Sequence, residues 1–237
     1  MFVEHLEDRV DLERLKLGVE VSSPPVQQRE VLYKPRFQRF GGGFNVGYRQ
    51  NLGGPDGFIL YQVAANYQAS YFFTRNTWLT GTLSANVLNN YDKFRYDAPS
   101  RLPRVRTDLR QYMTTSDVNV PNLQLTTAGR FGTDWFGMAY AGYLEWMYAG
   151  VGGELLYRPM GESWAAGVNL NYVRQREYDQ HVGLRDYSIT TGHASLYYAL
   201  DREERIVASI SAGRYLAGDY GATVNIARVF DNGVTMG

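Results

Sequence analysis

His193 and Ser195 have the residue types and the spacing that nucleophilic catalysis requires. Residues i and i+2 lie on one face of a β-strand, so the imidazole could activate the hydroxyl as a nucleophile. Ala194, Leu196 and Tyr198 form the apolar side of the same alternation, which turns His193 and Ser195 toward the polar side. A lipid hydrolase, however, needs its nucleophile within reach of lipid. We therefore interpret the two residues as a polar pair and expect no enzymatic activity, with a lipid hydrolase as a remote alternative.

Charged and aromatic side chains on the polar side of the expected strands could contact a hydroxyl-rich polymer. These candidates are Arg130, Tyr143, Glu145, Glu154, Arg158 and Arg214. Paired acids and bases could hydrogen-bond sugar hydroxyls, and Tyr143, counted as pointing inward, could offer a stacking face to a sugar ring. The alternative is a structural network of ion pairs that fills a narrow interior and keeps buried charges compensated. The sequence leaves both interpretations open.

A long connection spanning residues 91–121 contains five arginines, Arg95 among them, and the four candidates for anion binding are Arg101, Arg104, Arg106 and Arg110. A loop of this length is usually functional or disordered, and arginine binds phosphate and carboxylate oxygens bidentately. The loop could therefore contact an anionic polysaccharide or lipid phosphates. An internally paired loop or plug is equally compatible with the sequence, because four acidic residues lie nearby: Asp92, Asp97, Asp108 and Asp117. Residues 107–113 could form one or two helical turns.

The composition excludes several other kinds of site. The chain has no cysteine, which removes a disulfide scaffold, a cysteine-ligated metal and a cysteine nucleophile. A multi-histidine metal centre would need all three of its histidines, so we do not expect one. Lys plus Arg and Asp plus Glu each number 24, so the chain lacks the basic excess of a nucleic-acid binder. No GxGxxG, Walker or HExxH motif occurs. We expect no metal, no cofactor and no nucleic-acid partner.

Residues 40–237 alternate between apolar and polar side chains with a period of two, which is typical of β-strands. In residues 59–73 the odd positions are apolar or aromatic, while the even positions include Gln62, Asn66 and Ser70. Similar segments bring the expectation to about ten strands: residues 44–49, 79–87, 123–131, 136–148, 151–158, 164–175, 187–200, 206–212 and 220–226. Several are closer to the roughly 9–11 residues of a membrane-crossing strand than to the roughly 5–6 of soluble domains.

Long strands with small central residues, aromatic ends and one polar face favour an all-β, antiparallel barrel of the outer-membrane type. Four tryptophans would then lie near the membrane interfaces: Trp78, Trp135, Trp146 and Trp164. Residues 51–57 and 231–233 predict hairpin turns, and residues 218–219 predict a tight turn. The chain stops at Gly237, soon after the last turn, and strand edges cannot stay unpaired in lipid. We therefore expect closing strands to be missing.

Residues 1–39 are more densely charged than the rest of the chain. We interpret them as a polar connector or the end of a preceding domain, and residues 40–237 as the barrel domain, truncated at its C-terminus. The first residues lack the apolar segment of a secretory signal, so any targeting segment would lie outside this sequence.

Six segments between residues 95 and 233 carry recognisable motifs. They read SRLPRVRTD at residues 100–108, GYLEWMYAG at 142–150, VGGELLYRP at 151–159, TGHASLYY at 191–198, GRYLAGDYGAT at 213–223 and RVFDNG at 228–233. In this order they resemble the YjbH-like, GfcD-related family of Gram-negative outer-membrane proteins encoded with exopolysaccharide and capsule genes. The resemblance implies the C-terminal barrel portion of a longer protein that serves polysaccharide secretion. It implies outer-membrane lipid as a partner and possible contact with exopolysaccharide and other secretion-operon proteins. We take no catalytic residues from this resemblance.

Other interpretations of the barrel remain open at this stage. A porin-like or structural outer-membrane barrel is the first, and a soluble β-domain is another. The His-x-Ser pattern is also similar to that of outer-membrane phospholipase A, but Leu196 and Tyr198 depart from the residues that follow it there. The sequence does not identify the polysaccharide.

Overall fold

A computed structural model of the chain describes residues 37–54, 56–95, 101–201 and 205–237. The chain separates into two units, residues 1–37 and 38–237. The interpretation of residues 1–39 as a polar connector concerns positions that lie almost wholly outside the described ranges, so it stays a prediction.

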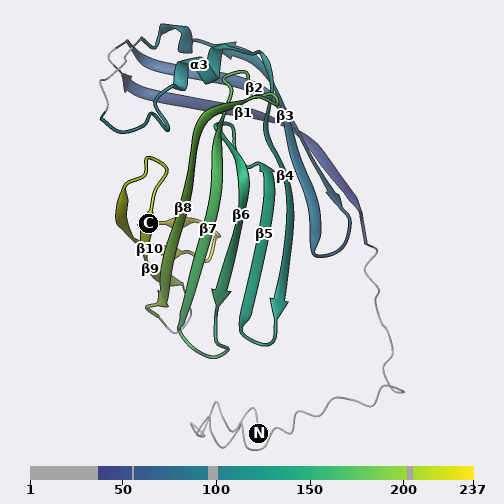
Figure 1. Ribbon diagram of the computed structural model, residues 1–237, viewed down its shortest axis with the longest axis vertical. Helices are drawn as coiled ribbons and strands as arrows, with labels where there is room; N and C mark the ends of the chain where they lie inside the picture. Colours follow the sequence, from purple (N-terminus) through teal and green to yellow (C-terminus); the bar gives the residue numbers. More distant parts are fainter. Residues whose placement is uncertain (1–36, 55, 96–100, 202–204) are drawn as a thin grey trace, which may run out of the picture. The chain divides into compact units, whose positions relative to one another are not determined.

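The described residues of the second unit form one antiparallel sheet of eleven strands, in which each strand pairs with its neighbours in sequence (Figure 1). The strands are β1 (Phe40–Gly54), β2 (Gly57–Phe72), β3 (Thr77–Asn89), β4 (Val118–Phe131), β5 (Trp135–Tyr143), β6 (Tyr148–Tyr157), β7 (Trp164–Arg176), β8 (Leu184–Ala199), β9 (Ile206–Arg214), β10 (Tyr220–Val229) and β11 (Thr235–Met236). The all-β antiparallel fold class is thus confirmed. Within these residues no pairing joins β1 to β11, so the closed barrel stays a prediction.

The register of the sheet separates apolar and polar positions onto opposite faces. Phe44 pairs with Tyr67, and Tyr67 pairs with Leu83, so three apolar side chains form one row across β1, β2 and β3. The adjacent residue Asn66 pairs with Ser84, which begins a polar row on the other face. Because successive side chains of a strand point to opposite faces, the alternation predicted for residues 59–73 and 79–87 is confirmed.

Burial is reversed relative to a soluble sheet. The apolar face is open: Leu170 and Val224 expose 64% and 69% of their surface. The polar face is covered: Thr126 and Gln175 expose only 3% and 4%. A soluble domain places large aliphatic side chains inside and polar ones outside. In this sheet the apolar face is exposed and the polar face is buried.

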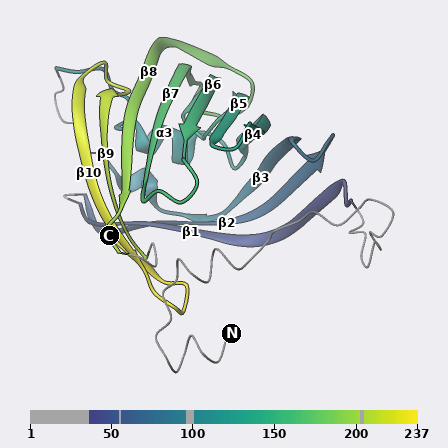
Figure 2. The same cartoon turned by 90° about the horizontal axis from the view of Figure 1, so that it is seen from below.

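The polar face is the concave side of the sheet, and the short helix α3 (Leu109–Thr114) lies against it (Figure 2). Met113 packs with Leu60 of β2, while Tyr112 packs with Tyr148 of β6 and Ile189 of β8. One helix can touch strands so far apart in the sheet order only if the sheet curves around it. The helical turns predicted for residues 107–113 are therefore present, beginning two residues later. A 3-10 turn, η2 (Tyr91–Lys93), precedes α3 along the chain. Neither α3 nor any other described helix is long and apolar enough to cross a membrane.

Two turns follow the sequence prediction closely. Gly218 and Gly233 adopt positive φ angles of 87° and 82° in the β9–β10 and β10–β11 connections, where glycine is favoured. The single strand predicted for residues 136–148 is wrong, because β5 ends at Tyr143 and β6 starts at Tyr148. Residues 144–147 form the turn between the two strands, in which the backbone N–H of Glu145 donates a 3.1 Å hydrogen bond to the carbonyl oxygen of Tyr148.

The tryptophans do not share one environment. Trp135 and Trp164 each contact Tyr157, at ring centroid distances of 4.8 and 5.7 Å, and form an aromatic cluster at strand ends. Trp78 pairs with the buried Thr126, so it belongs to a row of the polar face. Trp146 follows β5 and packs between the two hydrophobic clusters that hold α3. The interface position predicted for Trp146 is therefore wrong.

Candidate functional site

The inner segment, defined as residues 101–117 with α3 at its centre, occupies the concave face of the sheet. A helix of six residues is too short to be stable by itself in water. Its stability must come from packing, and two adjacent side chains supply it. Tyr112 and Met113 expose 1% and 2% of their surface and enter two separate clusters. The sheet therefore holds the helix at two sides.

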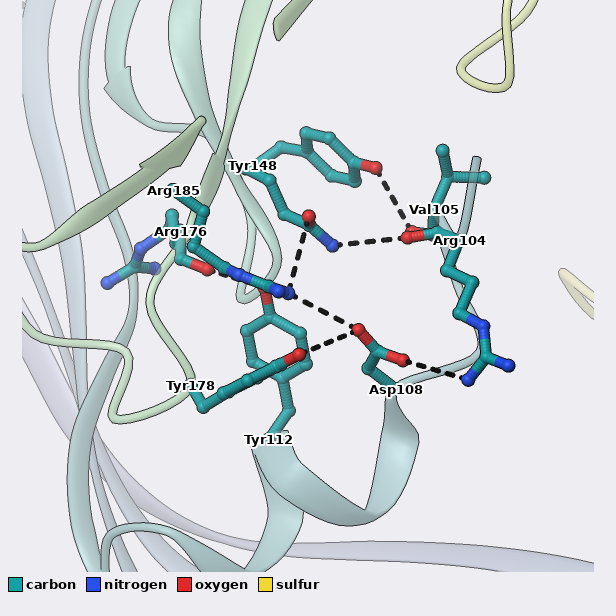
Figure 3. A network of polar contacts seen from close by, with 9 residues as sticks. Arg104, Val105, Asp108, Tyr112, Tyr148, Arg176, Tyr178 and Arg185 are labelled. Carbon is teal, nitrogen blue, oxygen red and sulfur yellow. Dashed lines mark hydrogen bonds and ion pairs between the residues drawn. The ribbon is translucent and has the colours of Figure 1, made fainter. Parts of the chain in front are cut away.

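Asp108, directly before α3, is the acidic centre of a polar network (Figure 3). Its Oδ2 accepts a hydrogen bond of 2.8 Å from the Tyr178 hydroxyl and lies 3.2 Å from Nη1 of Arg185. Its Oδ1 lies 3.9 Å from Nη1 of Arg104. A carboxylate that is nearly buried needs such compensation, because an unpaired buried charge is costly. Asp108 thereby ties the inner segment to the β7–β8 hairpin.

Arg176, at the end of β7, is fully buried and is surrounded by backbone carbonyl groups. Its guanidinium donates hydrogen bonds to the carbonyl oxygens of Pro121, Glu145, Gln180 and His181, at 3.3, 3.0, 2.5 and 3.0 Å. These carbonyl groups come from β4, the β5–β6 connection and the β7–β8 connection. One side chain therefore gathers three separate parts of the chain at this end of the sheet.

Two hydrogen bonds connect α3 to Arg176 at the end of β7 and to Gln180 in the loop that follows. The Tyr112 hydroxyl donates a 2.5 Å hydrogen bond to the carbonyl oxygen of Arg176. The Gln180 amide donates one of 2.7 Å to the carbonyl oxygen of Tyr112. Gln180 adopts a positive φ of 56°, which few residues other than glycine do. Arg176, Gln180 and Tyr112 thus form a closed circuit of hydrogen bonds.

Burial changes the acidity of the tyrosines around α3. Burial raises the pKa of Tyr112 to about 12, and the nearby carboxylate of Asp108 adds to this effect. The pKa of Tyr178 is raised by burial and by its hydrogen bond to Asp108. Both phenols therefore keep their protons and serve as hydrogen-bond donors over the physiological pH range.

Two of the four candidate arginines in the predicted basic loop form ion pairs with acidic residues of the chain. Arg106 forms a 2.6 Å ion pair with Glu145, and its guanidinium lies 5.4 Å from the ring centroid of Tyr148. Arg104 pairs with Asp108, whereas Arg101 and Arg110 are exposed. Glu145 is the one lumen candidate that meets this loop in a described ion pair. Of the nearby acids, Asp117 accepts a hydrogen bond from Asn86, and Asp97 lies outside the described residues.

The other lumen candidates do not converge on one site. Arg130 binds the Thr133 carbonyl oxygen at the β4–β5 turn, and Arg214 lies 6.0 Å from the ring of Tyr220. Glu154 and Arg158 line a separate cavity of about 480 Å³ on the sheet. The polysaccharide contacts of these residues stay a prediction.

Tyr143 is the last residue of β5 and contacts Arg176. Its partner across β4 and β5 is Leu123, which is 39% exposed and belongs to the apolar rows. The ring lies 4.3 Å from the Arg176 guanidinium, so it packs against a structural cation. The contact of Tyr143 with a sugar ring stays a prediction.

His193 and Ser195 share the polar face, as expected, but each has its own partner. Ser195 Oγ lies 2.7 Å from Ser211 Oγ, and His193 Nδ1 lies 3.4 Å from Asn169 Oδ1. No hydrogen bond between the two residues occurs in the described part of the chain. The interpretation of the two residues as a polar pair rather than as a base and its nucleophile stays a prediction.

Sequence reasoning missed the residues that organise the site: Tyr112, Arg176, Tyr178, Gln180 and Arg185. For the last four of these, the signal was the dense alternation of charged and aromatic residues at positions 172–187, which exceeds what a simple hairpin turn needs. The hydrogen bonds of Arg176 to backbone carbonyl groups could not have been predicted in this way, because every residue type carries such a group. The described residues contain no group of acids and histidines suited to hold a metal ion.

Comparison with known proteins gives consistent results for this chain. A model of the YjbH family, described as "Exopolysaccharide biosynthesis protein YbjH", matches residues 4–237. A protein of Escherichia coli K12 named "Uncharacterized lipoprotein YjbH" is 43% identical over 194 residues, which cover 79% of this chain and 28% of that protein. The chain therefore spans little more than a quarter of the length of this relative. No solved structure matches the chain.

Asp108→Asn should loosen the inner segment. The substitution removes the charge that compensates Arg185 and leaves buried polar groups poorly paired, at a cost of roughly 1–3 kcal/mol. We expect tryptic cleavage within residues 101–110 to become about tenfold faster, because proteolysis requires local opening. Mass spectrometry of timed digests measures this rate. Asp117→Asn, at the exposed end of the same segment, is the matched control; equal rates for the two variants would contradict the role of Asp108.

Tyr112 should make stability fall at high pH. The folded state holds the phenol proton up to a pKa of about 12, whereas the unfolded chain releases it near the ordinary value of about 10. Between these values the folded state binds more protons, so the free energy of unfolding decreases as pH rises. Urea unfolding followed by tryptophan fluorescence at pH 9 to 12 measures the slope. Tyr112→Phe should flatten it, and Tyr220→Phe, at an exposed position, should not.

Proposed function

The chain belongs to the YjbH family of exopolysaccharide biosynthesis proteins, and from this premise we propose that it is the barrel-forming part of an outer-membrane protein. In this proposal the protein takes part in export or surface assembly of an exopolysaccharide and has no enzymatic role. The relative from Escherichia coli is named a lipoprotein, which supports a location in the bacterial cell envelope. The chain covers 28% of that relative, so the activity and partners of the whole protein are part of the proposal.

The observation that carries the proposal is the reversed burial of the sheet. Tyr48, Leu170 and Ile226, on widely separated strands, expose 57–64% of their surface on the apolar face. Water would penalise so large an apolar surface by roughly 25 cal/mol per Å², whereas a bilayer would remove the penalty. Strands of 9–16 residues suit a bilayer, since about 9–11 residues cross it when tilted. Outer-membrane lipid is thus the proposed partner of this face.

The concave face supports a role in polymer passage or assembly. Its rows consist of amide and hydroxyl side chains such as Asn66, Ser84 and Thr191, which can exchange hydrogen bonds with sugar hydroxyls. The inner segment lies across this face and would have to be accommodated by any passing chain. We propose exopolysaccharide, and other proteins encoded for its secretion, as further partners.

The proposal can be tested on the full-length protein expressed with its natural targeting signal. Membrane-extracted protein should migrate differently on a detergent gel before and after boiling, because a closed barrel resists the detergent until heated. Deletion of the gene should reduce the exopolysaccharide released by the cells, and the wild-type gene should restore it. The Ser195→Ala variant should restore it equally, since no catalytic role is proposed for this residue.

Three results would contradict the proposal. Protein that is monomeric in buffer without detergent would make the apolar face the surface of a soluble β-domain. Unchanged polysaccharide release, combined with a steady conductance in planar bilayers, would favour a porin-like or structural barrel. Loss of release in Ser195→Ala would favour the lipid hydrolase.

A further inference from the structure

A small polar cavity lies on the concave face between β1, β2, β3 and the inner segment. Its volume is about 210 Å³. This is smaller than the roughly 300–1,000 Å³ of sites for drug-sized ligands, so its size suits a single sugar ring. The polar residues of its lining include Arg49, Gln62, Asn66, Thr82, Ser84 and Asn119.

The polar lining offers hydrogen-bonding groups that the protein itself does not use. Gln62, Thr82, Ser84 and Asn119 make no side-chain hydrogen bond to another residue in the described ranges. Ser84 pairs with Asn119 across β3 and β4, and Asn66 pairs with Ser84 across β2 and β3. Amides and hydroxyls in one row can each donate and accept, which matches the hydroxyl groups around a pyranose ring.

Arg49 supplies the one cationic group of this lining. It is the register partner of Gln62, and its guanidinium lies 4.6 Å from the ring centroid of Trp146. Its Nη1 also contacts the Met113 sulfur at 3.4 Å, which is a weak acceptor. Within the described residues no carboxylate forms an ion pair with Arg49, and the cavity lining contains no Asp or Glu. The cation is therefore oriented by Trp146 while its charge is left uncompensated.

We propose that this cavity binds one acidic sugar unit, of the uronic acid class, in the exopolysaccharide. The sugar carboxylate would pair with Arg49, because guanidinium groups bind carboxylates bidentately. The sugar hydroxyls would bind Gln62, Asn66, Ser84 and Asn119. This inference deepens the proposed function and rests on it for the polymer, while the binding site itself depends only on the cavity.

Two methyl glycosides that differ only at C6 test the charge requirement: methyl β-D-glucuronide and methyl β-D-glucoside. Binding to the full-length protein in detergent can be measured by saturation-transfer NMR titration. We expect the glucuronide to bind at least tenfold more tightly than the glucoside. Inorganic phosphate, as a plain anion, should displace the glucuronide only at far higher concentration, since it cannot use the hydroxyl-binding groups.

Two variants separate the roles of the charge and of the amides. Arg49→Gln should weaken the glucuronide about tenfold and leave the glucoside unchanged. Gln62→Met keeps the side-chain length without its amide, so it should weaken both glycosides by a similar factor, about fivefold for one lost hydrogen bond. Arg228→Gln, an exposed arginine on β10, is the matched control and should change neither. The heat-dependent gel shift reports whether each variant is folded.

The inference is overturned if neither glycoside binds, if both bind equally, or if Arg49→Gln binds the glucuronide as the wild type does. Phosphate that competes at the same concentration would reduce the cavity to a general anion site and would also overturn it. These failures can be distinguished from failure of the proposed function. A heat-modifiable protein that is needed for polysaccharide release but binds no glucuronide would contradict the sugar site alone.

Discussion

The buried guanidinium of Arg176 is the interaction on which the arrangement of the concave face depends. A charge removed from water must be compensated, and here the compensation comes from four carbonyl oxygens in β4 and two connections. Those connections then have little freedom to move apart. The loop that carries Trp146 and the loop that carries Gln180 are fixed by this single side chain, and both of them contact α3.

The position of the helix follows from this constraint. The Gln180 side chain binds the backbone of Tyr112, and the Tyr112 hydroxyl binds the backbone of Arg176. The helix is therefore held by the same network of hydrogen bonds as Arg176. Met113 is thereby directed to Leu60 of β2. The contacts of one turn of helix with both β2 and β8 keep the sheet curved. A curved sheet with a polar, filled inner side and an apolar outer side is the architecture that the proposed membrane barrel requires.

Much of the fold could be predicted from the sequence because strand alternation is local information. The two faces of residues 59–73 and 79–87, the turns at Gly218 and Gly233 and the helical turns near residue 109 follow from side-chain period and turn chemistry. The turn between β5 and β6 could not be predicted, since it has partners far away in sequence, such as Arg176, which binds the carbonyl oxygen of Glu145. Burial of Trp146 was missed for the same reason: its neighbours come from α3 and β1, far away in sequence.

The candidate site was predicted only in part. The basic loop and Glu145 were identified as separate candidates, and their ion pair through Arg106 was not predicted. The remaining lumen candidates are distributed over the sheet, because alternation indicates the face of a residue and not its height along the strand. Arg176 and Arg185 act through a backbone carbonyl network and through Asp108, which lies far away in sequence. Such contacts arise from the packing of whole elements, so residue types and spacing do not indicate them.

The central claim is that the apolar face of the sheet meets lipid and the polar face meets an aqueous interior. The chain has no cysteine, so single cysteines can be introduced along residues 166–172 of β7 and spin-labelled in the full-length protein reconstituted in vesicles. Electron paramagnetic resonance then measures collisions with oxygen, which enters lipid, and with a polar nickel complex, which does not. We predict high oxygen accessibility at even positions such as Val168 and Leu170, and nickel accessibility only at odd ones. Equal nickel accessibility at both sets of positions would contradict the account.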